Sequence, residues 1–246
     1  MAKPWQVVDS IEIEEGVLEL RRRGEGDFLI TIDNRVLMNS SANMSEVVLA
    51  ELACAPFKNK KKPRVLVGGL GMGFTLKAAL DNLPPDAEVT VAELTPVVVE
   101  WCRGPIAALT GGAVDDPRVT VVIDDVASLI GEAARQGKDR GFDAIILDLY
   151  EGPYEGNQEG EYLYGDGALS LSRAALKPGG VFAVWSEFPD RAFEKRLQAA
   201  GFAVNRQSPG RGGRRHVVYI GKKTSGSSGF KKPRSGGGVG RRKDRR

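Results

Sequence analysis

A glycine-rich turn is the first feature of the chain whose spacing suggests chemistry. It follows the apolar run at residues 65–67 and precedes a helical pattern that opens at Phe74. Glycine tolerates positive φ and lets a ligand approach the backbone, and the following helix presents free N–H groups. The turn therefore predicts a small-molecule cofactor site, with contacts from Gly69, Leu70, Gly71, Met72 and Gly73.

Acidic residues end the next two apolar runs. Glu93 stands twenty residues after Gly73, where a carboxylate can accept two hydrogen bonds from a ribose diol. The alternative is a surface Glu at a strand end. Asp124 and Asp125 end the third run and suit an adenine amino group, or a helix N-cap before Val126. Because parallel strands end at one edge of a sheet, these signals predict a nucleoside site that also includes Leu94 and Val126.

Strand and helix patterns alternate around these residues. Short β-type runs at residues 17–21, 28–32 and 35–38 predict a small N-terminal antiparallel β-domain, residues 1–42. A helix at 43–55, capped by Ser41 or Asn43, and a polar linker complete residues 43–63. Residues 64–222 predict a Rossmann-like α/β domain, with a seven-stranded sheet whose last two strands are antiparallel.

Composition restricts the class of protein. Hydrophobic residues make up 41% and charged residues 27%, as in a soluble globular protein. No apolar run suits a membrane span, and the first residues do not resemble a secretory signal. Cys54 and Cys102 stand alone, without a metal-binding spacing. We therefore expect a cytoplasmic protein with a small-molecule substrate, no metal and no membrane contact.

The charge is unevenly distributed. Residues 222–246 hold ten Lys or Arg and one acid, whereas the rest of the chain has a net charge of −6. The segment 223–246 is rich in Gly, Ser, Lys and Arg, so we expect a disordered basic tail. Such a tail could contact nucleic acid, although a solvated appendage is the favoured interpretation. The oligomeric state is open, and a homodimer is allowed.

Together, the motifs resemble the spermidine synthase family, a branch of the class I S-adenosylmethionine-dependent methyltransferase fold with an N-terminal β-domain. The resemblance spans residues 15–190 and includes the glycine turn, the two acidic strand ends and the Leu-Lys-Pro-Gly-Gly segment at 176–180. It implies an S-adenosyl cofactor. It also implies that Asp148 and Glu151 match the acids that bind and deprotonate the attacking amine.

The chain departs from the family pattern at two places. Met72 stands where the family has an Asp that faces the amino group of decarboxylated S-adenosylmethionine. An Asp there would repel the carboxylate of ordinary S-adenosylmethionine, so Met72 favours the ordinary cofactor. Before the glycine turn, only Glu46 survives of the family's acceptor-binding set, and Ser45 replaces its His. Polyamine specificity is therefore not expected.

The segment after the fourth strand of the predicted sheet supplies the remaining site residues. Asp148 and Glu151 form the predicted catalytic pair, and Tyr150 and Glu46 the predicted substrate contacts. Asp148 could instead cap a strand end. The segment contains four tyrosines, Tyr150, Tyr154, Tyr162 and Tyr164. They could line an acceptor pocket or pack a loop, and the sequence supports the two interpretations equally. His216, on a late strand, is interpreted as structural or exposed.

Three functions compete. The favoured hypothesis is methyl transfer from S-adenosylmethionine to a small amine or hydroxyl, because this needs mainly positioning and at most one base. The second is a polyamine aminopropyltransferase that uses decarboxylated S-adenosylmethionine. The third is a nucleoside-binding module without catalysis. A serine hydrolase and an NTPase are not favoured, because the chain has no G-x-S-x-G motif and the glycine turn lacks the G-K-[ST] ending of a phosphate loop.

Overall fold

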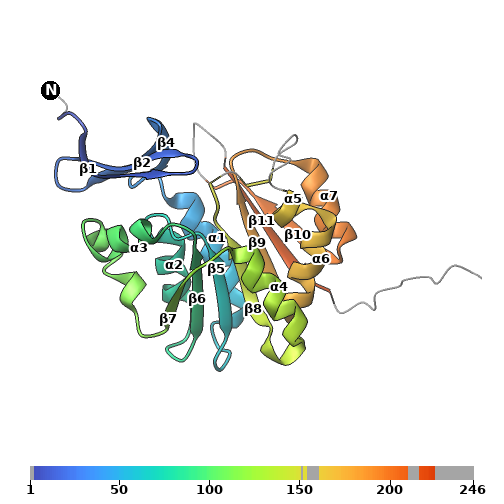
Figure 1. Ribbon diagram of the computed structural model, residues 1–246. Coiled ribbons are helices and arrows are strands. Elements are labelled where there is room, and N and C mark those ends of the chain that lie inside the picture. The colour runs from blue at the N-terminus through green and yellow to red at the C-terminus, as the bar shows by residue number, and fades with distance from the viewer. Residues whose placement is uncertain (1–2, 151, 154–160, 210–215, 225–246) are drawn as a thin grey trace, which may run out of the picture.

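Two β-sheets organise the chain (Figure 1). A computed structural model describes residues 3–150, 152–153, 161–209 and 216–224. The smaller sheet has the order β1-β2-β3-β4 and the larger one β10-β11-β9-β8-β5-β6-β7. The predicted α/β fold, with seven strands in the main sheet and a separate antiparallel N-terminal sheet, is confirmed.

The N-terminal sheet is antiparallel throughout. Its strands are β1 (Gln6–Ile13), β2 (Gly16–Arg23), β3 (Asp27–Ile32) and β4 (Arg35–Asn39). The predicted tight turn between β3 and β4 is present, with φ of 45° at Asp33 and 64° at Asn34. Strand β1 is not predicted from the sequence, because it is exposed along nearly its whole length and lacks the alternation that marks a half-buried strand.

The main sheet carries the parallel strands β5 (Arg64–Gly68), β6 (Glu88–Glu93), β7 (Val119–Ile123), β8 (Phe142–Leu147) and β9 (Leu176–Ser186). Antiparallel strands β11 (Val217–Lys223) and β10 (Phe202–Gln207) follow at one edge. Every residue of β8 is buried, as expected for a parallel strand covered on both faces.

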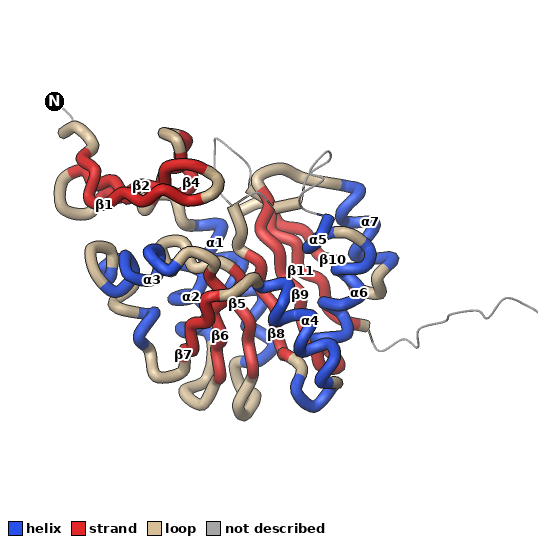
Figure 2. The backbone as a smooth tube through the Cα atoms, viewed as in Figure 1, coloured by secondary structure: helices blue, strands red, loops and turns tan. Residues whose placement is uncertain are grey.

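Helices cover both faces of the main sheet. Figure 1 shows α4 and α6 in front of the strands and α1 behind them, and Figure 2 repeats this arrangement by element type. The helices are α1 (Met44–Cys54), α2 (Phe74–Asn82), α3 (Pro96–Arg103), α4 (Val126–Gln136), α5 (Glu161–Tyr164), α6 (Asp166–Ala175) and α7 (Arg191–Ala199). None of these helices has the length and apolar character needed to cross a membrane.

Two hydrophobic clusters result from this layering. Val65 and Val67 of β5 belong to the cluster that α1, α2 and α3 cover, whereas Leu66 between them joins the cluster under α4, α6 and α7. Leu20 and Ile30 of the N-terminal sheet belong to the first cluster. The small sheet therefore shares a core with one face of the main domain.

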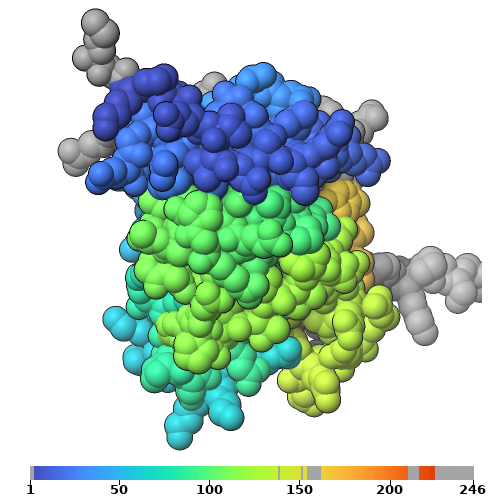
Figure 3. Space-filling view, turned by 60° about the vertical axis from the view of Figure 1, so that its left-hand side comes forward, coloured from blue at the N-terminus to red at the C-terminus, as the bar shows by residue number. Residues whose placement is uncertain are grey.

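The N-terminal sheet lies over the main domain, where its blue surface covers the green one (Figure 3). A polar contact adds to the shared core: Trp101 Nε1 of α3 donates a hydrogen bond to Asp9 Oδ2 of β1 at 2.7 Å. Asn43 is the N-cap residue of α1, but its side chain accepts no hydrogen bond from that helix. The amide nitrogen of Asn43 instead donates to the carbonyl of Ser40, so the predicted side-chain cap is wrong.

A buried acid anchors the linker before β5. Asp143 of β8 accepts hydrogen bonds from Lys60 Nζ at 2.5 Å, from the Arg64 N–H at 2.9 Å and from Lys177 Nζ at 3.1 Å. Burial alone would raise the pKa of Asp143, but the three donors outweigh it and hold the pKa below its usual value. The linker is thereby fixed to the end of the sheet opposite the predicted site.

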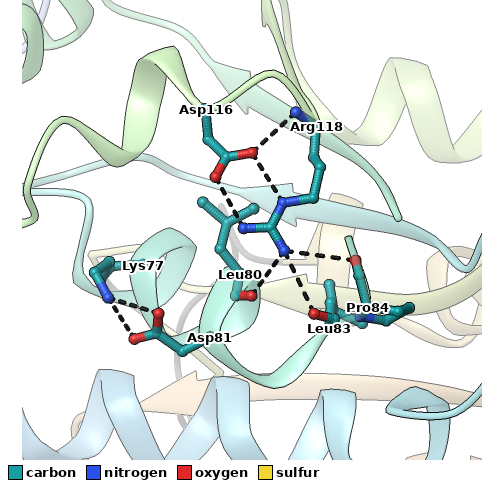
Figure 4. Close-up of polar contacts among 7 residues, drawn as sticks. All are labelled: Lys77, Leu80, Asp81, Leu83, Pro84, Asp116 and Arg118. Carbon is teal, nitrogen blue, oxygen red and sulfur yellow. Dashed lines mark hydrogen bonds and ion pairs between the residues drawn. The ribbon is translucent and has the colours of Figure 1, made fainter. Parts of the chain in front are cut away.

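Arg118 joins the start of β7 to the end of α2 (Figure 4). Its guanidinium forms two hydrogen bonds with Asp116, at 2.9 and 2.8 Å, and donates to the carbonyls of Leu80, Leu83 and Pro84. These carbonyls lie at the C-terminal end of α2, where a helix leaves acceptors unpaired. The hydrogen bond from Arg118 lowers the pKa of Asp116.

We predict that Arg118→Ala lowers the free energy of unfolding by about 2 kcal/mol, because it leaves Asp116 and the helix carbonyls without this donor. Urea denaturation followed by circular dichroism measures the change. The matched control is Lys77→Ala on α2. Lys77 forms an exposed ion pair with Asp81, which contributes about 0.5 kcal/mol or less to stability. Equal losses in both variants would contradict this role for Arg118.

Candidate active site

A cavity of about 480 Å³ lies between the N-terminal sheet and the C-terminal ends of the parallel strands. The small sheet contributes an apolar wall of Ile13, Leu18, Ile30, Ile32, Leu37 and Met38. The main domain contributes polar groups from the ends of β5, β6, β7 and β8. The cavity is thus at the edge where the sequence places the cofactor site, and the N-terminal sheet forms its roof.

The glycine turn requires its glycines. Gly69, Gly71 and Gly73 have φ of 86°, 52° and 82°, a region that side chains with a Cβ rarely adopt. A Cβ on Gly69 would also collide with the carbonyl of Asp148, and one on Gly71 with the side chain of Met38. Gly69 and Gly71 line the cavity, as predicted for cofactor contacts.

The side chains between these glycines point away from the cavity. Leu70 and Met72 are buried in the hydrophobic cluster that α1, α2 and α3 cover, and neither lines the cavity. The Met72 N–H donates to Met38 Sδ at 3.1 Å. The sequence argument that Met72 sets the charge around the cofactor therefore has no support in this geometry.

Glu93 connects the glycine turn to the start of α3. Its Oε2 accepts from the Leu70 N–H and its Oε1 from the Thr95 N–H, both at 2.9 Å. Each carboxylate oxygen keeps a further acceptor position, so the group can still bind a diol. Beside it, Leu94 is 63% exposed and lines the same cavity. Glu93, the predicted ribose contact, and its neighbour Leu94 thus both line the cavity.

The acids after β7 have two roles open to them. Asp125 caps α4 by accepting from the Ala127 N–H at 2.9 Å, so the N-cap interpretation is confirmed for this residue. Asp124 accepts from the Asp125 N–H at 2.7 Å. Asp124, Asp125 and Val126 all line the cavity. The cap leaves a second Asp125 oxygen for a ligand, so both predicted roles are compatible.

Two carboxylates from distant parts of the chain meet the cavity. Asp148 follows β8 and accepts from Thr75 Oγ1 at 2.5 Å. Glu46, on α1, is 6% exposed and accepts from Ser45 Oγ at 2.6 Å. Burial raises the pKa of Asp148 to about 7, with a further rise from the charge of Glu46 and an opposing effect of the Thr75 hydrogen bond. Asp148 is therefore a carboxyl group able to take and release a proton near neutral pH.

Aromatic side chains form part of the cavity wall. Tyr150, Tyr162 and Trp185 line it, and the guanidinium of Arg35 lies 4.8 Å from the Tyr150 ring centroid. Tyr164 instead packs edge-on against Phe193, with ring centroids 5.7 Å apart. The predicted tyrosine cluster is thus divided between the cavity and the core. Glu151 and Tyr154 lie outside the described residues.

His216 lies at a position that the sequence did not predict, beside the buried Ser45 of α1. Its Nδ1 lies 3.0 Å from Ser45 Oγ, and its ring meets Trp185 edge-on with centroids 4.9 Å apart. Because β11 runs antiparallel to β9 and pairs Val217 with Ser186, the residue before β11 lies at the cavity edge of the sheet. The predicted antiparallel last strand was the signal that could have located this histidine.

The cavity is strongly acidic. Among the described residues, its lining holds six acids and one base, which are Glu15, Glu46, Glu93, Asp124, Asp125, Asp148 and Arg35. Such a lining attracts cations and repels a ligand carboxylate. The described part of the chain contains no group of three or more His, Cys, Asp or Glu side chains arranged to hold a metal ion.

Comparisons with known proteins identify relatives of this chain. The chain is 35% identical over 148 residues to a polyamine aminopropyltransferase of Mycobacterium tuberculosis, which covers 57% of this chain and 27% of that protein. It is 38% identical over 136 residues to polyamine aminopropyltransferase 1 of Hyperthermus butylicus, which covers 54% of this chain and 44% of that protein. The matches span less than half the length of these relatives.

A solved structure and a family model complete the comparison. The fold is similar to that of spermidine synthase from Thermotoga maritima, with a TM-score of 0.70 at 21% identity, covering 89% of this chain and 73% of that one. The model of the spermine/spermidine synthase domain matches residues 29–195, which is most of the chain and includes Glu46, the glycine turn and Asp148. The chain therefore belongs to the spermine/spermidine synthase family.

Proposed function

We propose that this protein is an aminopropyltransferase, which moves the aminopropyl group of decarboxylated S-adenosylmethionine to a small amine. The observation that carries the proposal is a pair of carboxylates, the buried Glu46 and the partly buried Asp148, in an acidic cavity beside the glycine turn. The aminopropyltransferase names of the relatives favour this function over methyl transfer, which the sequence analysis placed first.

Charge supports the choice of cofactor. Decarboxylated S-adenosylmethionine has a sulfonium and an amine but no carboxylate, so the acidic lining attracts both ends. Ordinary S-adenosylmethionine would bring a carboxylate into the same field. In this proposal, Glu93 holds the ribose, Asp124 and Asp125 lie at the adenine, and Gly69 and Gly71 admit the backbone approach.

The acceptor half of the cavity suits an ammonium group. Glu46 and Asp148 attract the protonated amine, and Tyr150 and Tyr162 line the same cavity and can contact the methylene chain of the acceptor. The amine must lose a proton before its nitrogen can attack. Asp148 takes that proton, because its pKa near 7 lets it act as a base at neutral pH.

The transfer itself is a nucleophilic displacement. The bound sulfonium supplies the electrophilic carbon: its C–S bond breaks with the electron pair going to sulfur, while the amine nitrogen forms the new C–N bond. The chain contributes position and charge, holding the amine beside Asp148 and the cofactor against the glycine turn. The N-terminal sheet covers one side of the cavity and so reduces the access of bulk water to the reacting groups.

Methyl transfer is the second candidate, and Arg35 favours it. This side chain is the one base among the described residues of the cavity wall, and it could pair with the carboxylate of ordinary S-adenosylmethionine. The two candidates differ in the cofactor that binds more tightly, which makes them separable by direct binding.

We expect decarboxylated S-adenosylmethionine to bind at least about tenfold more tightly than the ordinary form, measured by titration calorimetry. With this cofactor and a short aliphatic diamine, turnover is expected. Asp148→Asn should lower kcat by about 100-fold, because the base is lost.

The matched control for that variant is Asp81→Asn, an exposed acid on α2, which should keep wild-type kcat. Tighter binding of ordinary S-adenosylmethionine, with methyl transfer to the acceptor, would contradict aminopropyl transfer and support methyl transfer. Binding of either cofactor without turnover on a panel of amines would indicate a module without catalysis.

The pH dependence of kcat/KM provides a separate prediction. Since Asp148 must be ionised to take a proton, kcat/KM should rise with pH and level off above about 7. Thr75→Val removes the hydrogen bond that favours the charged form, so the midpoint should move to higher pH. Glu46→Gln removes a negative charge that disfavours the charged form, so the midpoint should move to lower pH.

Steady-state rates at low acceptor concentration, measured across the pH range for the three proteins, test this prediction. The acceptor's own ionisation is common to all three proteins, so the difference in midpoint reports on Asp148. Shifts in the same direction for both variants, or identical midpoints, would exclude Asp148 as the base.

A further inference from the structure

His216 stands next to the acceptor half of the cavity without belonging to its lining. It precedes β11 and is partly buried between two elements, with Nδ1 at 3.0 Å from Ser45 Oγ of α1 and its ring edge-on to Trp185 of β9. Ser45 is buried, and its neighbour Glu46 lines the cavity. Three side chains from α1 and the start of β11 thus form one hydrogen-bonded chain.

The direction of this chain follows from the number of protons available. The Ser45 hydroxyl has one hydrogen, and it donates to Glu46 Oε2 at 2.6 Å. Ser45 Oγ can then only accept at its contact with His216. The imidazole Nδ1 must therefore carry a hydrogen, and the bonds run from His216 to Ser45 to Glu46.

The last group of this hydrogen-bonded chain is the Glu46 carboxylate, whose burial is unfavourable. A carboxylate that is 6% exposed, like that of Glu46, is stable only when hydrogen bonds replace its water. Ser45 supplies one such bond, and His216 orients the hydroxyl that makes it. Without the imidazole, the hydroxyl is free to rotate away from Glu46.

We propose that His216 is a positioning residue, which through the Ser45 hydroxyl holds the ionised Glu46 carboxylate in the orientation that receives the ammonium group of the acceptor. This role rests on the proposed function for its effect on catalysis. The hydrogen-bonded chain itself does not, and can be measured in the protein without substrates.

The histidine can be observed directly, because it is the only one in the sequence. Long-range ¹H–¹⁵N NMR on the full chain without a histidine tag, at roughly pH 8.5 where imidazole is neutral, distinguishes the two tautomers. The Nδ1–H form is expected in the wild type, with loss of this preference in Ser45→Ala. An Nε2–H form in the wild type would overturn the proposal, because Ser45 would then donate to the ring and not to Glu46.

Kinetics test the consequence for the acceptor. His216→Leu removes the donor, so the KM of the diamine should rise about tenfold, with the Kd of decarboxylated S-adenosylmethionine unchanged. His216→Asn places an amide N–H near the position of Nδ1 and should restore KM to within about threefold of wild type. If KM rises equally in both variants, His216 acts by packing its ring against Trp185 and not by donating a hydrogen bond, and the proposal is overturned.

A double-mutant cycle completes the test. Since His216 acts through Ser45, the variant with both His216→Leu and Ser45→Ala should be no worse than Ser45→Ala alone, whereas additive losses would contradict the chain. If the wild type shows no turnover, the proposed function fails, but the NMR result and the same cycle on diamine Kd by calorimetry still decide the role of His216.

Discussion

The placement of two carboxylates in one partly enclosed cavity, where burial and mutual repulsion both disfavour their charge, is the constraint on which the site depends. Asp148 and Glu46 both face a space that the N-terminal sheet covers, where charges interact more strongly than in water. Each acid accepts a hydrogen bond from a hydroxyl on a helix: Asp148 from Thr75 of α2, and Glu46 from Ser45 of α1. The donors make the burial tolerable, and the remaining negative field makes a cation the natural ligand. A raised pKa at Asp148 is the result of the same arrangement.

The cavity forms between the two sheets of the structure. The C-terminal ends of the parallel strands provide the polar floor, and the small sheet provides an apolar roof that shares its core with α1, α2 and α3. The bond from Trp101 to Asp9 holds the roof to the side of the main domain. Contacts at the opposite end of the strands, such as those of Asp143 and Arg118, hold the linker and the loops without touching the cavity. The contacts that stabilise the linker and loops thus lie at one end of the strands, and the cavity lies at the other.

The charge of the whole cavity, and not the residue type at Met72, is the relevant feature for cofactor preference. The residue type at Met72 suggested that the site had lost its preference for a cofactor without a carboxylate. Met72 is buried in the core, however, and the charge that a cofactor meets comes from Glu46, Glu93, Asp124 and other acids on separate elements. Electrostatic selection acts through the summed field, so a single position in the turn does not determine it.

The sequence by itself determined the features that depend on neighbours along the chain. The glycine turn, Glu93 after the next strand and the Asp125 cap were all predictable, because a strand, its turn and its helix are local, and parallel strands end at one edge. The exposed strand β1 lacked a pattern and was missed. Only the tertiary structure could turn Met72 into the core, bring Glu46 beside Asp148 and place His216 against Ser45. These pairings join residues far apart in sequence, and the packing of α1 and β11 on the sheet, which no periodicity encodes, decides them.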